Sequence, residues 1–214
     1  KSPWHTVDGI HYGVPFLWSA NRVLYSESVF QEPPVSNSVI FEEQILPDGL
    51  TNSNRVQAYE GAMAIADAAL FLMQQRPELG IRDPYELDRD QFGEAVNLLR
   101  RQRDLVSSYW TDAPDQMNTF LTEGNAVSIA WPSTIKMMEN QGLPVQSVIS
   151  VEGATGRADT FMLSSEAPHP NCAYRWMEHI LDPQVQGDAA AWTGTNPSVA
   201  AACETSNLLS DDGC

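Results

Sequence analysis

The apolar positions of the chain follow strand-like spacing in some segments and helix-like spacing in others. Short apolar runs bounded by turn residues predict strands at Val14–Phe16, Val23–Tyr25, Ser107–Trp110, Ala126–Trp131, Val145–Val151 and Asp159–Leu163. Helical spacing predicts helices at Ala62–Met73, Phe92–Arg103, Pro114–Glu123, Pro132–Gln141, Asn171–Leu181 and Pro183–Trp192. This alternation of strands and helices is typical of the α/β class.

Local signals refine three of these elements. The segment Ala62–Met73 is apolar on nearly every face, which predicts a buried helix. Asp90 is expected to cap the helix that begins at Phe92, because a short acidic side chain accepts from the free amides of a first turn. Pro15 restricts its strand to a sheet edge or to a position without a ladder donor.

Composition excludes some classes of protein. With 214 residues, 43% hydrophobic residues and six Trp, the chain can bury a full core, as one large domain or as two lobes. No apolar run approaches the roughly 18 residues that span a bilayer. The net charge of −16 argues against nucleic acid as a partner and favours cationic ligands, although surface solvation alone accounts for such acidity equally well.

The cysteines suggest one disulfide and no metal site. Cys203 and Cys214 bracket a short polar segment, and a disulfide between them would close this loop in an oxidising compartment. Cys172 lies in a helical pattern and is expected to be a buried thiol. The spacing does not match a zinc site.

Motifs of known enzyme chemistry are missing from the sequence. None of the four His is placed in a zinc-protease pattern, and the chain has neither a nucleophile elbow nor a phosphate loop. We therefore expect no catalytic residues and no cofactor. A hydrolase on a similar α/β frame remains the alternative, and a buried acid–base pair or a metal would identify it.

Aromatic and acidic residues gather at predicted strand ends and turns. Trp18 follows the Pro15 strand, Tyr59 and Glu60 precede the buried helix, Trp131 ends a strand, and Asp159 follows a Gly-containing turn. Ligands of α/β sheets bind at such junctions. Aromatic walls with terminal carboxylates suit an alkylammonium ligand, whereas each residue taken alone is equally explained as a core or capping residue.

Several longer segments resemble spermidine/putrescine-binding proteins, which are extracellular solute-binding proteins of ABC importers. The similar segments are Asp8–Asn21, Val127–Pro132, Val148–Gly153 and Pro170–Val185, in the same order and spacing. The resemblance implies a class II periplasmic-binding fold, in which two lobes joined by hinge strands clamp the ligand. It also implies that Glu60 and Asp159 bind ammonium groups and that Trp131 stacks on the ligand, with Trp18 as a wall residue.

Two positions depart from that family pattern. Arg157 stands where the family often has an aromatic residue, and Met63 stands where a second acid can occur. Arg157 can neutralise Asp159 or bind a ligand carboxylate through two hydrogen bonds. An amino acid-like ligand is therefore an alternative to a polyamine, and a sensor domain that has lost its ligand is another.

The resemblance also sets the expected domain organisation. It begins well inside the family pattern, so we expect about the first third of such a protein to be absent and the first lobe to be incomplete. The expected parts are residues 1–19 (first-lobe remnant and hinge), 20–150 (second lobe) and 151–214 (return hinge and C-terminal helices of the first lobe). The implied partner is an ABC permease, at a periplasmic or extracellular, cell-surface location, with possible anchoring through a lipidated N-terminus.

Overall fold

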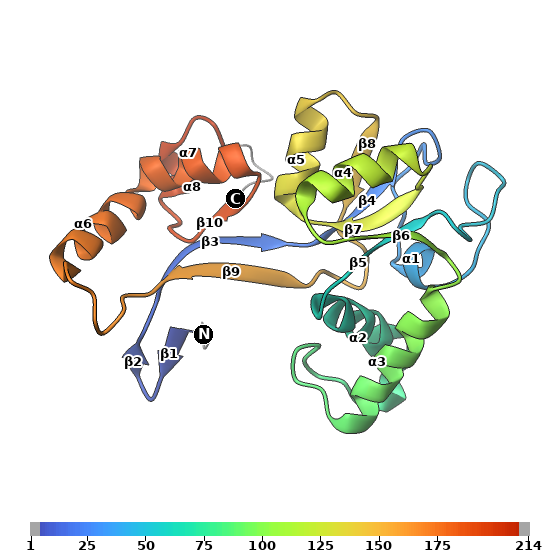
Figure 1. Ribbon diagram of the computed structural model, residues 1–214, viewed down its shortest axis with the longest axis horizontal. Helices are drawn as coiled ribbons and strands as arrows, with labels where there is room; N and C mark the ends of the chain where they lie inside the picture. Colours follow the sequence, from blue (N-terminus) through green and yellow to red (C-terminus); the bar gives the residue numbers. More distant parts are fainter. Residues whose placement is uncertain (1–4, 210–214) are drawn as a thin grey trace. The chain divides into compact units, whose positions relative to one another are not determined.

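The computed structural model describes residues 5–209, and the chain divides into two compact units (Figure 1). Unit 1 comprises residues 1–19 and 156–214, and unit 2 comprises residues 20–155. The chain therefore passes between the units twice, at Ser19–Ala20 and at Thr155–Gly156. The element order confirms the predicted α/β class.

Unit 2 is built on a five-stranded mixed sheet with the order β6-β5-β7-β4-β8. Its strands are β4 (Arg22–Ser26), β5 (Val56–Tyr59), β6 (Val106–Trp110), β7 (Val127–Ala130) and β8 (Val145–Val148). Strand β5 runs parallel to both β6 and β7, whereas β4 runs antiparallel to β7 and β8. The carboxyl ends of β5, β6 and β7 therefore lie at the same edge of the sheet.

Helices cover both faces of this sheet, with α2 and α3 on one side and α4 and α5 on the other (Figure 1). The helical elements of unit 2 are α1 (Ser38–Phe41), α2 (Met63–Gln75), the 3₁₀ turn η2 (Pro77–Leu79), α3 (Arg89–Gln102), α4 (Ala113–Thr122) and α5 (Pro132–Asn140). Successive residues of β4 separate the two cores: Val23 and Tyr25 pack with α2 and α3, and Leu24 packs with α4 and α5. A strand whose two faces are both buried needs an apolar side chain at each successive position. This explains the uninterrupted apolar run Val23–Tyr25 in β4.

Unit 1 contains the remaining elements. They are β1 (Thr6–Val7), β2 (Ile10–His11), β3 (Val14–Ala20), β9 (Gly156–Phe161), α6 (Pro170–Ile180), α7 (Pro183–Thr193), β10 (Asn196–Pro197) and α8 (Ala202–Thr205). Strands β1 and β2 form a hairpin, and β3 is the middle strand of a sheet with the order β10-β3-β9. Pro15 is thus on the middle strand and not on an edge strand. It is not paired with β10, however, because only Leu17 and Trp18 of β3 pair with that strand.

The predicted helices and strands are all present, within a few residues at each end, and one cap is corrected. Helix α3 begins earlier than predicted, and its cap is Asp88 rather than Asp90. The Asp88 carboxylate accepts from the amides of Asp90 and Gln91, and the Gln91 side chain accepts from the Asp88 amide. This capping box satisfies three amide donors that would otherwise lack partners. Within residues 5–209, no helix has both the length and the apolar character that crossing a membrane requires.

The expectation of a buried Cys172 thiol is wrong. Cys172 is exposed and free on α6. The buried stripe of this helix runs through Met177 and Ile180, and Cys172 lies beside it, in line with the exposed Trp176 and His179. Cys214 lies outside the described residues, so the Cys203–Cys214 disulfide stays a prediction.

Candidate functional site

Three aromatic residues meet at the carboxyl edge of the parallel strands in unit 2. Tyr59 is the last residue of β5, Trp110 is the last residue of β6, and Trp131 directly follows β7. Helices α2, α4 and α5 begin within a few residues of these positions. This is the edge at which ligands bind in α/β sheets, so the topology itself brings the aromatic residues to a binding position.

The three rings form a contiguous cluster. The ring centroids are 4.6 Å apart for Tyr59 and Trp110, 4.9 Å for Trp110 and Trp131, and 5.7 Å for Tyr59 and Trp131. Trp110 is 1% exposed, whereas Tyr59 and Trp131 are half-buried. Trp110 therefore forms the base of the cluster, and the other two rings offer partly exposed aromatic surface.

Glu60 lies directly beside this aromatic cluster. Its side chain is exposed, and its backbone amide donates to the carbonyl oxygen of Trp110 at 2.9 Å. That bond continues the β5–β6 ladder one residue beyond the strand and fixes the position at which the carboxylate leaves the backbone. Three of the predicted site residues, Tyr59, Glu60 and Trp131, thus lie at the same edge of the sheet, and their binding of a ligand stays a prediction.

Gly61 allows the Tyr59 ring to fold back over the chain. A Cβ atom at Gly61 would lie 2.4 Å from Cε1 and 2.8 Å from the hydroxyl oxygen of Tyr59, which is too close for any side chain. A glycine at this position is therefore required for the observed position of the ring.

The variant Gly61→Ala is expected to disrupt the aromatic cluster while the protein remains folded. The ring is the far end of a flexible side chain and can move away, so the free energy of unfolding is expected to fall by no more than about 1–3 kcal/mol, the usual cost of overpacking. The displaced ring leaves Trp110 and Trp131, so the near-ultraviolet circular dichroism of the protein should change. Gly93→Ala is the matched control, because a Cβ atom there meets nothing within 4 Å. Equal spectra for both variants would contradict the role given to Gly61.

Trp110 is a member of the aromatic cluster that the sequence did not single out as a site candidate. The sequence predicts only a strand there, although Trp110 shares one signal with Trp131: each is an aromatic residue at the end of a strand, just before a helix. Asp112 caps α4 by accepting from the Asp115 amide, two residues after Trp110. The buried indole Nε1 of Trp110 finds no acceptor among residues 5–209.

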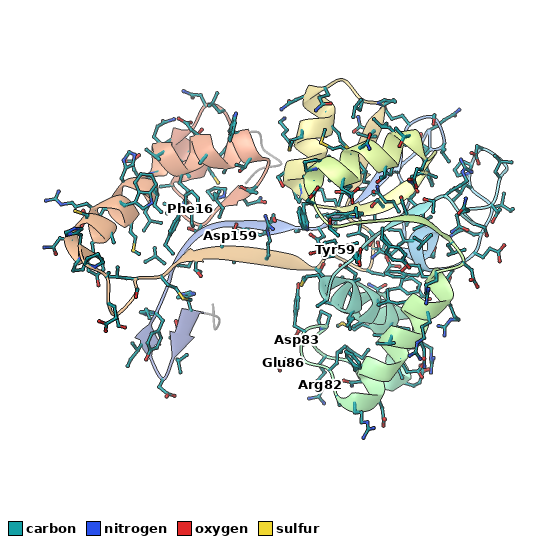
Figure 2. The ribbon with its side chains drawn as sticks, viewed as in Figure 1. Phe16, Tyr59, Arg82, Asp83, Glu86 and Asp159 are labelled. Atoms are coloured by element: carbon teal, nitrogen blue, oxygen red, sulfur yellow. The ribbon has the colours of Figure 1, made fainter. Side chains whose placement is uncertain are left out.

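The other predicted site residues belong to unit 1 and lie on two neighbouring strands. Trp18 lies within β3, and Arg157 and Asp159 lie within β9. Their predicted location at strand ends is therefore wrong for Trp18 and Asp159, because each strand extends past them. Asp159 is labelled on its strand in Figure 2.

These residues share one face of the unit 1 sheet. Phe16 and Trp18 lie on the same face of β3, and Arg157, Asp159 and Phe161 lie on the same face of β9, because side chains alternate along a strand. The centroids of the Phe16 and Phe161 rings lie 5.2 Å apart, which places both sets on one side of the sheet. Trp18 is 45% exposed and donates from Nε1 to the Pro197 carbonyl oxygen at 3.1 Å.

The candidate residues thus form two sets, one in each unit. Tyr59, Glu60 and Trp131 belong to unit 2, with Trp110 added by the structure. Trp18, Arg157 and Asp159 belong to unit 1. That all of them line one ligand site stays a prediction.

One strongly perturbed acid lies in unit 2, away from the aromatic rings. Asp67 of α2 is 5% exposed, and burial raises its pKa to about 6, although hydrogen bonds from Thr155 and Asn21 oppose the rise. Among residues 5–209, no group of three or more His, Cys, Asp or Glu is placed to hold a metal ion.

Comparison with known proteins gives consistent matches over almost the whole chain. The family model described as "Bacterial extracellular solute-binding protein" matches residues 1–213. A putrescine/agmatine-binding protein of Pseudomonas aeruginosa is 24% identical over 200 residues, which cover 87% of this chain and 51% of that protein.

Solved structures share the fold at low sequence identity. The spermidine/putrescine ABC transporter substrate-binding protein PotD of Streptococcus pneumoniae matches with a TM-score of 0.72 at 17% identity, covering 96% of this chain and 58% of that one. The periplasmic binding protein AgtB of A. tumefaciens R10, solved with agropinic acid, matches with a TM-score of 0.68 at 19% identity, covering 100% and 63%. The chain therefore spans about half to two thirds of the length of these relatives.

Proposed function

We propose that this chain, which belongs to the bacterial extracellular solute-binding proteins, captures a small cationic solute of the polyamine type for delivery to an ABC importer. The observation that carries the proposal is the aromatic cluster of Tyr59, Trp110 and Trp131 with Glu60 beside it. Aromatic faces attract alkylammonium groups and cover methylene chains, and a carboxylate accepts charge-assisted hydrogen bonds from the ammonium protons. The putrescine/agmatine-binding and spermidine/putrescine-binding relatives support the same ligand class.

The proposed mechanism is capture by closure of two lobes. A ligand that binds residues of both units stabilises the conformation in which both sets of contacts are made, so binding shifts the population toward that conformation. In this proposal Glu60 and Asp159 each bind an ammonium group, while Tyr59, Trp131 and Trp18 cover the carbon chain. The protein transforms nothing, needs no cofactor and has an ABC permease as its partner. Its place is the periplasm or the cell surface, with a lipid anchor as one means of attachment.

Isothermal titration calorimetry on the purified full-length protein tests the proposal. Putrescine, spermidine, agmatine and 4-aminobutyrate are titrated separately, and at least one amine is expected to bind with saturable heat. Absence of binding to all four would count against solute capture of this class.

The variant Glu60→Gln is expected to weaken amine binding by about tenfold to a hundredfold, because a charge-assisted hydrogen bond is replaced by a neutral one. Glu123→Gln is the matched control, since Glu123 is exposed at the C-terminal end of α4 and lies outside the proposed site. Calorimetry of both variants checks the prediction, and equal affinity in Glu60→Gln and wild type would remove Glu60 from the site.

An amino acid-like solute is the second candidate, and Arg157 is the observation that favours it. Arg157 and Asp159 present opposite charges on one face of β9, which matches the two charged ends of a zwitterion. The relative solved with agropinic acid has the same fold and binds an acid. Tighter binding of 4-aminobutyrate than of putrescine, lost in Arg157→Gln, would select this candidate over the polyamine.

A further inference from the structure

The two passages of the chain between the units are tied to each other by hydrogen bonds. Asn21 follows the first passage and Thr155 precedes the second. The Asn21 amide donates to the Thr155 carbonyl oxygen at 2.7 Å, and the Asn21 Nδ2 donates to the Thr155 Oγ1 at 2.9 Å. Backbone and side chain together hold the two passages side by side.

A buried carboxylate fastens both of these residues to helix α2. Thr155 Oγ1 donates to Asp67 Oδ1, and the same hydroxyl accepts from the Asn21 side chain, so Asp67 reaches Asn21 through Thr155. Asp67 is 5% exposed, and it lies in the middle of an otherwise apolar helical segment. A buried carboxylate without a compensating cation is costly, so a position that carries one is a candidate for a specific role.

Two small cavities lie beside Asp67. It lines two small cavities of unit 2, one of about 10 Å³ shared with Asn21 and Thr155, and one of about 20 Å³ shared with Tyr59. Volumes of this size admit about one water molecule each. Asp67 thus lies between the passages on one side and the aromatic cluster on the other.

Helix α2 connects these two places directly. Its first residue, Met63, follows Glu60 by three positions, and Asp67 is one turn further along the helix. A displacement of α2 caused by a ligand at Glu60 would therefore be transmitted to the hydrogen bond that Asp67 accepts from Thr155, and through Thr155 to Asn21. Rigid helices transmit small displacements in this way.

We propose that Asp67 is a hinge-positioning residue, which holds Asn21 and Thr155 in register and links α2 to both passages between the units. The hydrogen-bond arrangement stands on its own, and only the effect on solute affinity rests on the proposed function. Asp67 binds no solute in this proposal, and it acts through the conformation of the hinge.

Amide hydrogen exchange on the full-length protein without solute tests the hinge part. The reporter is the Asn21 amide, and the reference is the Ser26 amide, which donates to Ala126 at 2.9 Å inside unit 2. Asp67→Ala is expected to speed exchange at Asn21 by about tenfold or more while leaving Ser26 within about threefold of wild type. Asp67→Asn keeps an acceptor oxygen and should restore most of the protection.

Thr155→Val gives the same test if Asp67→Ala does not fold, because it removes the hydroxyl donor and retains the shape of the side chain. Thr155→Ser keeps the hydroxyl and is its conservative control. Asp90→Asn on the surface of α3 is expected to change neither amide. Equal acceleration at Asn21 and Ser26, or no change at Asn21, would overturn the proposal, since the first result indicates general destabilisation and the second no role.

Calorimetry on the same variants separates this inference from the proposed function. If the wild-type protein binds an amine, Asp67→Ala should change its affinity by about threefold or more without any lost ligand contact. If no amine binds, the proposed function fails while the exchange result still decides the role of Asp67. If an amine binds and exchange at Asn21 is unaffected, the hinge role fails and solute capture stands.

Discussion

The variant Trp110→Ala is expected to lower the free energy of unfolding by about 3–5 kcal/mol, the usual cost of removing a fully buried large aromatic side chain. Trp110 is 1% exposed and contacts both Tyr59 and Trp131. Its removal leaves a cavity directly beneath the two partly exposed rings. Solute affinity should therefore fall by about tenfold or more even at temperatures where the variant remains folded.

Trp192→Ala is the matched control for this experiment. It makes the same chemical change, but Trp192 is 85% exposed on α7. Its effect on the free energy of unfolding should stay within about 0.5 kcal/mol. Urea unfolding followed by circular dichroism measures both variants, and similar midpoints for the two would show that Trp110 is not the base of the aromatic cluster.

The sequence predicted the elements of this fold well because their signals are local. Proline and glycine mark the ends of helices α2 and α5, and the apolar run of β4 reflects a strand buried on both faces. Errors of a few residues remain where two capping residues compete. Asp88 and Asp90 both precede the apolar part of α3, and only the reciprocal bond from Gln91 selects Asp88.

Features that depend on contacts with distant parts of the chain could not be predicted from local sequence signals. The β9 strand begins at Gly156 because it pairs with β3, more than a hundred residues earlier, and this extension places Asp159 within the strand. The helical pattern of α6 did not show which stripe faces inward, so Cys172 was wrongly expected to be buried. Tertiary packing decides such cases.

The candidate site was predicted in part for the same reason. Tyr59, Glu60 and Trp131 were selected by their positions at strand ends, which is a local property. Trp110 joins them only because β5 lies between β6 and β7 in the sheet, and the strand order cannot be derived from the apolar pattern. The role of Asp67 could not be predicted from its apolar helical segment, since Thr155, which donates to it, lies 88 residues away.

The ionisation of Asp67 should make the stability of the protein depend on pH in an uncommon direction for a carboxylate. Burial raises its folded pKa to about 6, above the ordinary value of 3.8 that applies in the unfolded chain. Between these values the folded protein holds a proton that the unfolded chain releases. The stabilising contribution is therefore complete below about pH 4 and is lost as the pH rises through about 6. A shift of about two units corresponds to roughly 3 kcal/mol.

Other titratable groups near Asp67 do not reverse this direction. Arg22 and Tyr59 are the other titratable residues that line its two cavities, and neither contributes to the pKa shift. Glu152 is bound nearby by the Asn37 amide at 3.0 Å. Burial raises the pKa of Glu152, but hydrogen bonds from Ser36 and Asn37 outweigh this effect and lower it.

Asp67→Asn removes the titration and should isolate this contribution. At pH 7 the variant is expected to be more stable than wild type by about 1–2 kcal/mol, less than the full shift because one donor of the new amide lacks a partner. As the pH falls below about 4 this advantage should disappear and then reverse in favour of wild type, because Asp67 becomes protonated in both states while the unpartnered amide donor of the variant remains. Urea unfolding of both proteins between pH 4 and pH 8 measures it.

Asp48→Asn is a control for which the expected dependence of stability on pH has the opposite sign. A hydrogen bond from Arg55 lowers the pKa of the exposed Asp48, so its contribution is present at neutral pH and is lost as the pH falls. This variant should be less stable than wild type at pH 7 by no more than about 1 kcal/mol, as for other surface ion pairs. A stability difference for Asp67→Asn that is independent of pH would mean that Asp67 does not titrate in this range. The buried carboxylate would then affect the hinge only through the geometry of its hydrogen bonds.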